Sequence, residues 1–225
     1  MKKNITIMLL ALAALSQPAS AQYHGRYPRA YLEGRPRTTT NHFARSDTYY
    51  GFRIGITGAT VNSDDARLDG GSMKSGLNVG FVAGFQLTPS TPLYFETGLS
   101  YTEKGGKGKY QGSKFTYSLD YLEVPLLMKY RVPLLPDVTI DPFLGGYLAL
   151  GVGGKIKDYG EREAYSSFSD NNFNRFDGGL RVGIGAQFSL LYVELGYDHG
   201  LANICGDSFD ESHTRTIFAN IGINF

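Results

Sequence analysis

The sequence predicts an all-β protein, an eight-stranded antiparallel up-and-down transmembrane β-barrel with both termini on the periplasmic side. Three observations lead to this prediction. Apolar residues alternate with small or polar ones in eight separate segments, which is the pattern of strands with one apolar face. The links between these segments alternate between short and long, and the chain opens with an export signal.

The first 21 residues have the three parts of a secretory signal peptide. Residues 2–3 are lysines, residues 5–15 are apolar, and residues 19–21 are the small residues of a cleavage site. The apolar run is shorter than the roughly 20 residues that a spanning helix needs, so cleavage is favoured over a retained anchor. We therefore expect cleavage near Ala21-Gln22 and a mature protein in the outer membrane.

Composition favours a β protein and argues against two classes, nucleic-acid-binding proteins and proteins held together by intramolecular disulfides. The chain has 29 Gly, 16 Tyr, 14 Phe and no Trp, which suits an aromatic-rich sheet. Loss of the signal removes two of the 22 basic residues and none of the 21 acidic ones. The mature protein is thus nearly neutral, and we expect no nucleic-acid partner. Cys205 is the only cysteine, so an intramolecular disulfide is excluded, and a passive small residue is favoured over a reactive thiol.

Residues 22–48 form a separate segment without strand periodicity. They include five arginines, two acidic residues and two prolines. This composition predicts a flexible basic arm. The arm could contact anionic lipid or a partner, although a solvated linker is favoured. The barrel is then expected over residues 49–225.

The eight alternating segments cover most of that range. In the last one, Ile217, Ile221 and Phe225 fall on one face and Phe218 and Asn220 on the other. Most segments approach the 9–11 residues that a tilted membrane strand needs. The predicted strands are 49–57, 77–87, 93–102, 121–130, 143–152, 180–188, 191–198 and 216–225.

The links support the barrel independently of the strands. The shorter links are 88–92, 132–139 and 189–190, and the longer polar ones are 62–74, 105–116, 156–176 and 202–213. This order is expected when short turns face the periplasm and long loops face the exterior.

Alternation alone does not distinguish a membrane barrel from a soluble lipocalin-like one, whose apolar face points inward. Here the less apolar face is mostly glycine with scattered charged and aromatic residues, unlike the dense charged coat of a soluble surface. The interior of an eight-stranded barrel is only wide enough to be filled by side chains, and glycine makes room there. The membrane barrel, with its apolar face outward, is therefore favoured.

The predicted inward face carries six charged residues: Arg53, Glu96, Glu123, Lys129, Arg181 and Glu194. Counting from the short turns, we expect Glu123 and Arg181 to lie further out than the other four. Opposite charges in a narrow lumen should pair, because an uncompensated buried ion costs several kcal/mol. A plug of salt bridges is favoured over a gated polar pathway.

Four runs resemble the PorT-like outer-membrane β-barrel family of Bacteroidota-type bacteria. They are 98–106 (GLSYTEKGG), 121–130 (YLEVPLLMKY), 192–204 (YVELGYDHGLANI) and 220–225 (NIGINF). The resemblance covers about residues 49–225 and implies an eight-stranded barrel, similar in architecture to OmpX- and OmpA-type barrels. It also implies delivery by the outer-membrane assembly machinery, which reads an aromatic C-terminal residue, here Phe225. The family implies no uniform activity, although one branch is tied to type IX secretion.

The long loops are the expected interaction sites, because binding residues concentrate on loops held by a rigid scaffold. The longest, 156–176, carries Tyr165, Phe168 and Phe173 among polar residues, a mix suited to recognition. We expect a non-catalytic structural or binding barrel, monomeric and surrounded by outer-membrane lipid, that contacts an extracellular ligand or protein. A loop without a ligand, an accessory barrel of a secretion system and a small-solute pore are the alternatives.

No residue pattern indicates a metal or cofactor. The four histidines are scattered, and Asp64, Asp65 and Asp69 lack the spacing of a calcium loop. Residues 151–154 (GVGG) lie in a strand pattern with no following helix, so they do not form a phosphate loop.

One enzymatic alternative stays open, an outer-leaflet lipid deacylase or acyltransferase. Ser212 and His213, with Asp210 or Glu211, supply the residue types for nucleophilic chemistry. Adjacent residues on a strand point to opposite faces, so Ser212 and His213 could pair only on a bent loop. The non-catalytic interpretation is favoured.

Overall fold

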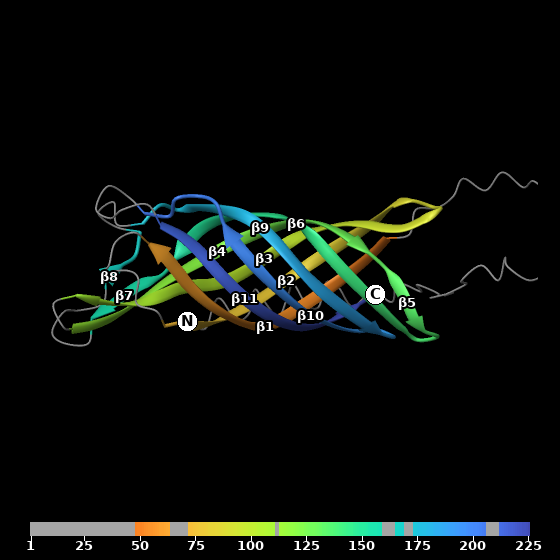
Figure 1. The fold of residues 1–225 in the computed structure, drawn as a ribbon, viewed down its shortest axis with the longest axis horizontal. Coiled ribbons are helices and arrows are strands. Elements are labelled where there is room, and N and C mark those ends of the chain that lie inside the picture. The colour runs from red at the N-terminus through yellow and green to blue at the C-terminus, as the bar shows by residue number, and fades with distance from the viewer. Residues whose placement is uncertain (1–47, 64–71, 111–112, 159–164, 169–172, 206–211) are drawn as a thin grey trace, which may run out of the picture. The chain divides into compact units, whose positions relative to one another are not determined.

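The structure is one antiparallel sheet that closes on itself (Figure 1). The computed structural model describes residues 48–63, 72–110, 113–158, 165–168, 173–205 and 212–225. Eight long strands form the wall: β1 (Thr48–Ser63), β2 (Lys74–Thr88), β3 (Thr91–Tyr110), β4 (Ser113–Tyr130), β6 (Val138–Gly153), β9 (Phe176–Phe188), β10 (Leu191–Gly200) and β11 (Ser212–Asn224). Three short strands extend the sheet: β5 (Val132–Leu135), β7 (Lys155–Asp158) and β8 (Tyr165–Ser166).

Two pairings close the barrel. The first strand, β1, pairs with the last, β11, and β4 pairs with β6, so each long strand has two neighbours. The order around the wall is β1-β2-β3-β4-β6-β9-β10-β11, and every neighbouring pair is antiparallel. The predicted eight-stranded antiparallel barrel is confirmed. Within the described ranges, no helix is long and apolar enough to cross a membrane.

The predicted outward apolar face is present. Along β11, Ile217 and Ile221 are about half exposed on the outer surface, at 54% and 50%, while Phe218 between them is buried in the lumen at 2%. Leu144 on β6 and Leu195 on β10 are also largely exposed. A surface of this kind suits contact with lipid rather than with water.

Glycines on the inner face make room for tyrosine rings. A methyl group placed on Gly185 would lie 1.9 Å from the hydroxyl oxygen of Tyr192, and one on Gly84 would lie 2.1 Å from the Tyr49 ring. Both distances are far below a normal contact, so only glycine lets these rings cross the lumen.

The strands at the long-loop end extend further than the sequence predicted. Residues 105–116 were expected to form a loop, but β3 and β4 continue to pair up to Tyr110 and Ser113. The prediction was wrong because a run of glycines and lysines is typical of loops, whereas cross-strand pairing with the buried aromatic end of β4 forms a hairpin here. Gly105 has a φ of 127°, and Gly154 on the neighbouring side has a φ of 135°. Glycine is suited to both positions because they lie in the left-handed region.

The short link 132–139 is a hairpin. Val132 pairs with Ile140 and Leu135 with Val138, so β5 and the start of β6 leave only a tight turn.

Several expectations fall on residues that the structure does not describe. These are the signal peptide, residues 22–47 of the basic arm, Asp64, Asp65, Asp69, Asp210 and Glu211.

Candidate functional site

The lumen near the short turns holds an ion network centred on Lys129. Its Nζ lies 2.8 Å from Oε1 of Glu96 and 3.6 Å from Oε2 of Glu194. Arg53 Nη2 lies 3.9 Å from Oε2 of Glu96. Two cations and two carboxylates therefore balance one another, as a buried group of charges requires. We call these four residues the inner network.

Tyrosine hydroxyls complete the inner network. Tyr49 donates a hydrogen bond of 2.6 Å to Glu96 Oε2, so both oxygens of that carboxylate are engaged. Lys129 donates to the Tyr192 hydroxyl at 2.9 Å, and the Arg53 guanidinium lies 4.1 Å from the centre of the Tyr192 ring. Rings and charges thus pack together across the lumen.

A second network lies further from the short turns and contains two cations and three carboxylates. Arg181 is bound to Asp198 through two hydrogen bonds, at 2.6 and 2.7 Å, and its Nη2 also donates to Glu123. Lys104 Nζ lies 3.1 Å from Glu123 and 3.2 Å from Asp177. We call these five residues the outer network.

Asp177 gathers the neutral donors of the outer network. Thr214 donates to its Oδ2 at 2.9 Å, and the Tyr147 hydroxyl lies 3.4 Å away. Lys104 also sits over the Tyr147 ring, 3.9 Å from its centre. Lys104 and Asp177 are fully buried, and Tyr147 and Thr214 are each only 1% exposed. The outer network is thus sealed from bulk water.

The structure divides the six predicted lumen charges between the two networks. Arg53, Glu96, Lys129 and Glu194 make up the inner network. Glu123 and Arg181 belong to the outer network.

Sequence reasoning missed Lys104, Asp177 and Asp198. Asp198 lies on the inward face of the predicted strand 191–198, at its end. The other two continue the inward parity beyond predicted strands: Lys104 follows Thr102 on β3, and Asp177 precedes Arg181 by two strand repeats on β9. The signal was present, but the predicted strand ends fell short of Lys104 and Asp177.

A small cavity separates the two networks. Arg53, Arg181, Glu194 and Asn220 line it, together with backbone at Gly80. Arg53 Nε and Nη2 have no hydrogen-bond partner there. Buried polar groups of this kind are usually satisfied by ordered water.

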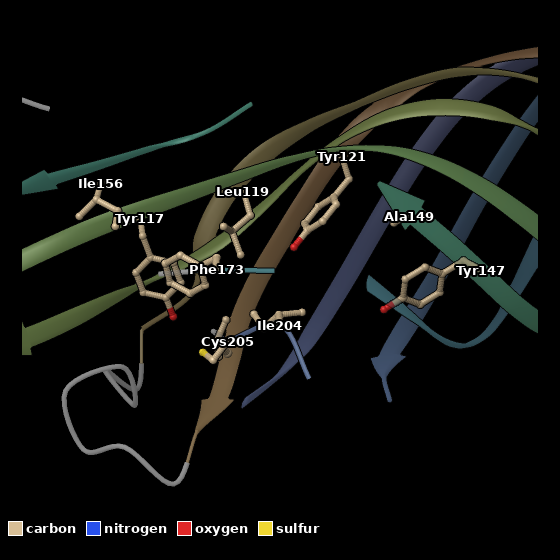
Figure 2. Packing of buried hydrophobic residues seen from close by; sticks show 10 residues of the cluster. Tyr117, Leu119, Tyr121, Tyr147, Ala149, Ile156, Phe173, Ile204 and Cys205 are labelled. Atoms are coloured by element: carbon tan, nitrogen blue, oxygen red, sulfur yellow. The ribbon is translucent and has the colours of Figure 1, made fainter. Parts of the chain in front are cut away.

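An apolar cluster fills the long-loop end of the lumen (Figure 2). It joins inward side chains of the wall, such as Tyr117 and Tyr121 on β4, to Phe173, Ile204 and Cys205 from the links before β9 and after β10. Phe173 stacks on Tyr117 with ring centres 5.4 Å apart. The lumen is therefore filled in three layers, the inner network, the outer network and this apolar cap.

The cap corrects the expectation for the longest loop. Phe173 is not displayed for recognition, because it is only 4% exposed within the cap. Phe168 also turns inward: its ring meets Tyr121 edge-on at 6.1 Å and covers Gly151. Tyr165 lies in β8. Aromatic residues in a polar segment suit binding, but Phe168 and Phe173 pack against the inner face of β4 instead. Cys205 is buried in the same cap, as expected of a passive residue.

The geometry does not assemble the enzymatic alternative. Ser212 is buried on the lumen side of β11, whereas His213 faces outward and its Nδ1 lies 3.1 Å from the Ala202 carbonyl. Adjacent strand residues point to opposite faces, so the two do not form a nucleophile–base pair. The part of the chain that is described also contains no group of three or more His, Cys, Asp or Glu placed to hold a metal ion.

Residues 37–206 match the family described as "Outer membrane protein beta-barrel domain". The match covers most of the chain, including the long strands β1 to β10. This chain belongs to the outer membrane protein beta-barrel domain family. No curated protein matches it significantly.

Several solved barrels are similar in fold. Ail, the attachment invasion locus protein of Yersinia pestis, is 16% identical, with 80% of this chain and 99% of that chain covered and a TM-score of 0.44. Neisserial surface protein A is 15% identical, with 78% and 97% covered and a TM-score of 0.46. OprG from Pseudomonas aeruginosa is 10% identical, with 80% and 97% covered and a TM-score of 0.42.

Proposed function

We propose that this outer-membrane barrel is a non-catalytic, monomeric anchor that holds an interaction surface at its long-loop end. The filled lumen is the observation that carries the proposal. Two buried ion networks and an apolar cap occupy the interior, and an eight-stranded barrel has little space beyond its side chains. Function then falls to the surfaces that the barrel displays.

Planar-bilayer recording tests the filled lumen. The purified barrel should show no steady conductance. A matched variant, Lys129→Ala with Glu96→Ala, removes an ion pair without changing the net charge and should introduce only brief openings. A stable channel in the parent protein would contradict the anchor and favour the small-solute pore.

An interaction screen tests the displayed surface. Intact cells should present the long links between strands at the exterior, because long loops face outward in barrels of this class. We expect a ligand or protein captured by the parent to be lost when one of these segments is replaced by a Gly-Ser linker of equal length. Retained capture by every loop variant would contradict the proposal.

We further infer membership of the PorT-like family, and export with cleavage between Ala21 and Gln22. The run 121–130 (YLEVPLLMKY), which resembles the hallmark strand of that family, supports the membership. N-terminal sequencing of the membrane-inserted protein tests the cleavage. A mature chain that begins at Gln22 is expected, and a retained Met1 would contradict it.

A further inference from the structure

A lysine-rich surface lies on the part of β3, β4 and β7 that extends past the closed wall (Figure 1). Lys107 on β3 pairs with Thr116 on β4, and Thr116 pairs with Lys157 on β7. Residues that pair directly share a face of the sheet. Lys155 lies two positions before Lys157 and is on the same face. We call Lys107, Lys155 and Lys157, with Thr116 between them, the lysine face.

Burial confirms which way this face points. Lys107, Lys155 and Lys157 are exposed. Ile156 and Tyr117, which pair with each other on the opposite face of the same strands, are buried in the cap. The apolar cap therefore supports this part of the sheet from behind and holds the lysine face outward.

The described residues place no counter-charge on the lysine face. Among the residues that the structure describes, none of its three lysines has an ion-pair partner. The outward acids on the same strands are Glu103 and Asp120. They lie four positions closer to the closed wall than Lys107 and Thr116. In a mature chain with nearly balanced charges, three unpaired ammonium groups form a local positive field.

The position of the lysine face selects a partner in the plane of the membrane. β3 and β4 continue directly from the lipid-facing wall, and the exposed row Leu148, Leu150 and Val152 on β6 leads to Gly154, after which β7 begins at Lys155. The face therefore points sideways, over the head groups of the surrounding leaflet. A soluble ligand approaching along the barrel axis would meet the loops and the cap first.

We propose that the lysine face binds the phosphorylated head group of a lipid in the surrounding leaflet. Two strand spacings separate Lys107 from Lys157, about 10 Å, and Lys155 lies about 7 Å along the strand from Lys157. Long lysine stems can converge from these positions on one phosphate. The proposal rests on the membrane anchor proposed above and names the partner of one of its surfaces.

The test compares two lipids that differ by one phosphate. The full barrel is reconstituted in phosphatidylcholine nanodiscs with 5 mol% phosphatidylinositol or 5 mol% phosphatidylinositol 4-phosphate, and retained lipids are counted by native mass spectrometry. We expect about three- to tenfold enrichment of the phosphorylated lipid around the parent barrel, since each lysine near a membrane surface attracts anionic lipid. Enrichment should return to the bulk ratio in the triple variant K107Q/K155Q/K157Q.

Two controls separate a site from general charge. The triple variant K107R/K155R/K157R keeps the positive charge and should keep the enrichment. The variant R215Q removes an exposed cation of β11, three strands away from β3, and should leave the enrichment unchanged. Two results would overturn the proposal. The first is equal retention of the phosphorylated lipid by the parent and the glutamine variant. The second is preferential binding of dextran sulfate that is added to pure phosphatidylcholine nanodiscs. Both leaflets of a nanodisc carry the same lipids, so this result does not depend on orientation, and a failure would leave the anchor function standing.

Discussion

Arg181 on β9 and Asp198 on β10 stand directly opposite each other in the sheet and are joined by two hydrogen bonds inside the lumen, Nε to Oδ1 at 2.6 Å and Nη2 to Oδ2 at 2.7 Å. Such a bidentate pair fixes both side chains in orientation as well as in distance. It also places Arg181 where it reaches Glu123 across the lumen. The sheet register therefore determines the geometry of the outer network.

The charge count of the outer network predicts that replacing different members will lower the free energy of unfolding by unequal amounts. With Lys104 and Arg181 against Glu123, Asp177 and Asp198, the network carries one excess negative charge. Arg181→Met leaves three carboxylates with one cation and should lower the free energy of unfolding by about 3–5 kcal/mol. Asp198→Asn leaves balanced charges and should cost only about 1–2 kcal/mol. Urea titration of the folded barrel in lipid vesicles measures both, and a larger cost for Asp198→Asn would refute this charge count.

The inner network predicts strong coupling between Lys129 and Glu96. Lys129→Met leaves Glu96 and Glu194 with Arg53 alone, while Lys129→Met with Glu96→Gln restores the balance of charges. We expect the double variant to be more stable than the sum of the two single losses by about 2 kcal/mol. A double-mutant cycle of unfolding free energies provides the measurement. Additive losses would mean that the two side chains act independently.

A pair of glycine variants tests the packing of the lumen. Gly185→Ala places a methyl group 1.9 Å from the Tyr192 hydroxyl oxygen, which also accepts the hydrogen bond of Lys129. It should lower stability by about 1–3 kcal/mol through overpacking. The matched control, Gly146→Ala on the outer face of β6, meets nothing closer than 3.1 Å and should change stability by less than about 0.5 kcal/mol. Equal effects would show that Tyr192 moves aside freely.

The opposite orientations of Ser212 and His213 predict no lipid hydrolysis through them. His213→Ala should show the same background turnover as the parent in a phospholipid and lipid A deacylation assay, because the buried Ser212 cannot reach the imidazole. A parent activity that disappears in His213→Ala would reopen the enzymatic alternative.

The period of two was enough to predict the strand number, the outer face and the inward set that contains Arg53 and Lys129, because each depends only on parity along a strand. Strand length was predicted less accurately than parity. The alternation continues through Gly105 and Gly106, but glycine has a low strand propensity, so the strand was expected to end before them. Their pairing depends on Tyr117, which is far along the next strand and buried against Phe173.

Counting from the short turns grouped the six predicted lumen charges by height, but it could not predict which side chains pair across the lumen. Lys104 and Asp177 are 73 positions apart, and only the stagger of the closed sheet brings them to one height. The inward turn of Phe168 and Phe173 is likewise a result of tertiary packing. Aromatic residues in a polar segment look the same in the sequence whether they are displayed or buried.

Phe225 closes the barrel through its backbone as well as through its ring. Its N–H donates to the Tyr50 carbonyl and its carbonyl accepts from the Tyr50 N–H, both at 2.8 Å, and the two rings lie 6.5 Å apart on the outer surface. Two roles can therefore be separated. Phe225→Ala keeps both backbone bonds, so refolding of the purified chain into lipid vesicles should proceed as in the parent protein. In cells, the same variant should reduce membrane insertion several-fold, because the assembly machinery is expected to read the aromatic ring, and Phe225→Trp should restore it.

Deletion of Phe225 removes the backbone bonds as well and should impair both processes. Band shift on unheated gels measures the folded fraction in vesicles and in isolated membranes. If Phe225→Ala inserts normally in cells while the deletion does not, the terminal residue acts only by completing the β1–β11 ladder. If both variants insert normally, neither the ring nor the ladder bonds at the terminus are required, and the seam between β1 and β11 is held by the register pairs that begin at Gly51 and Asn224.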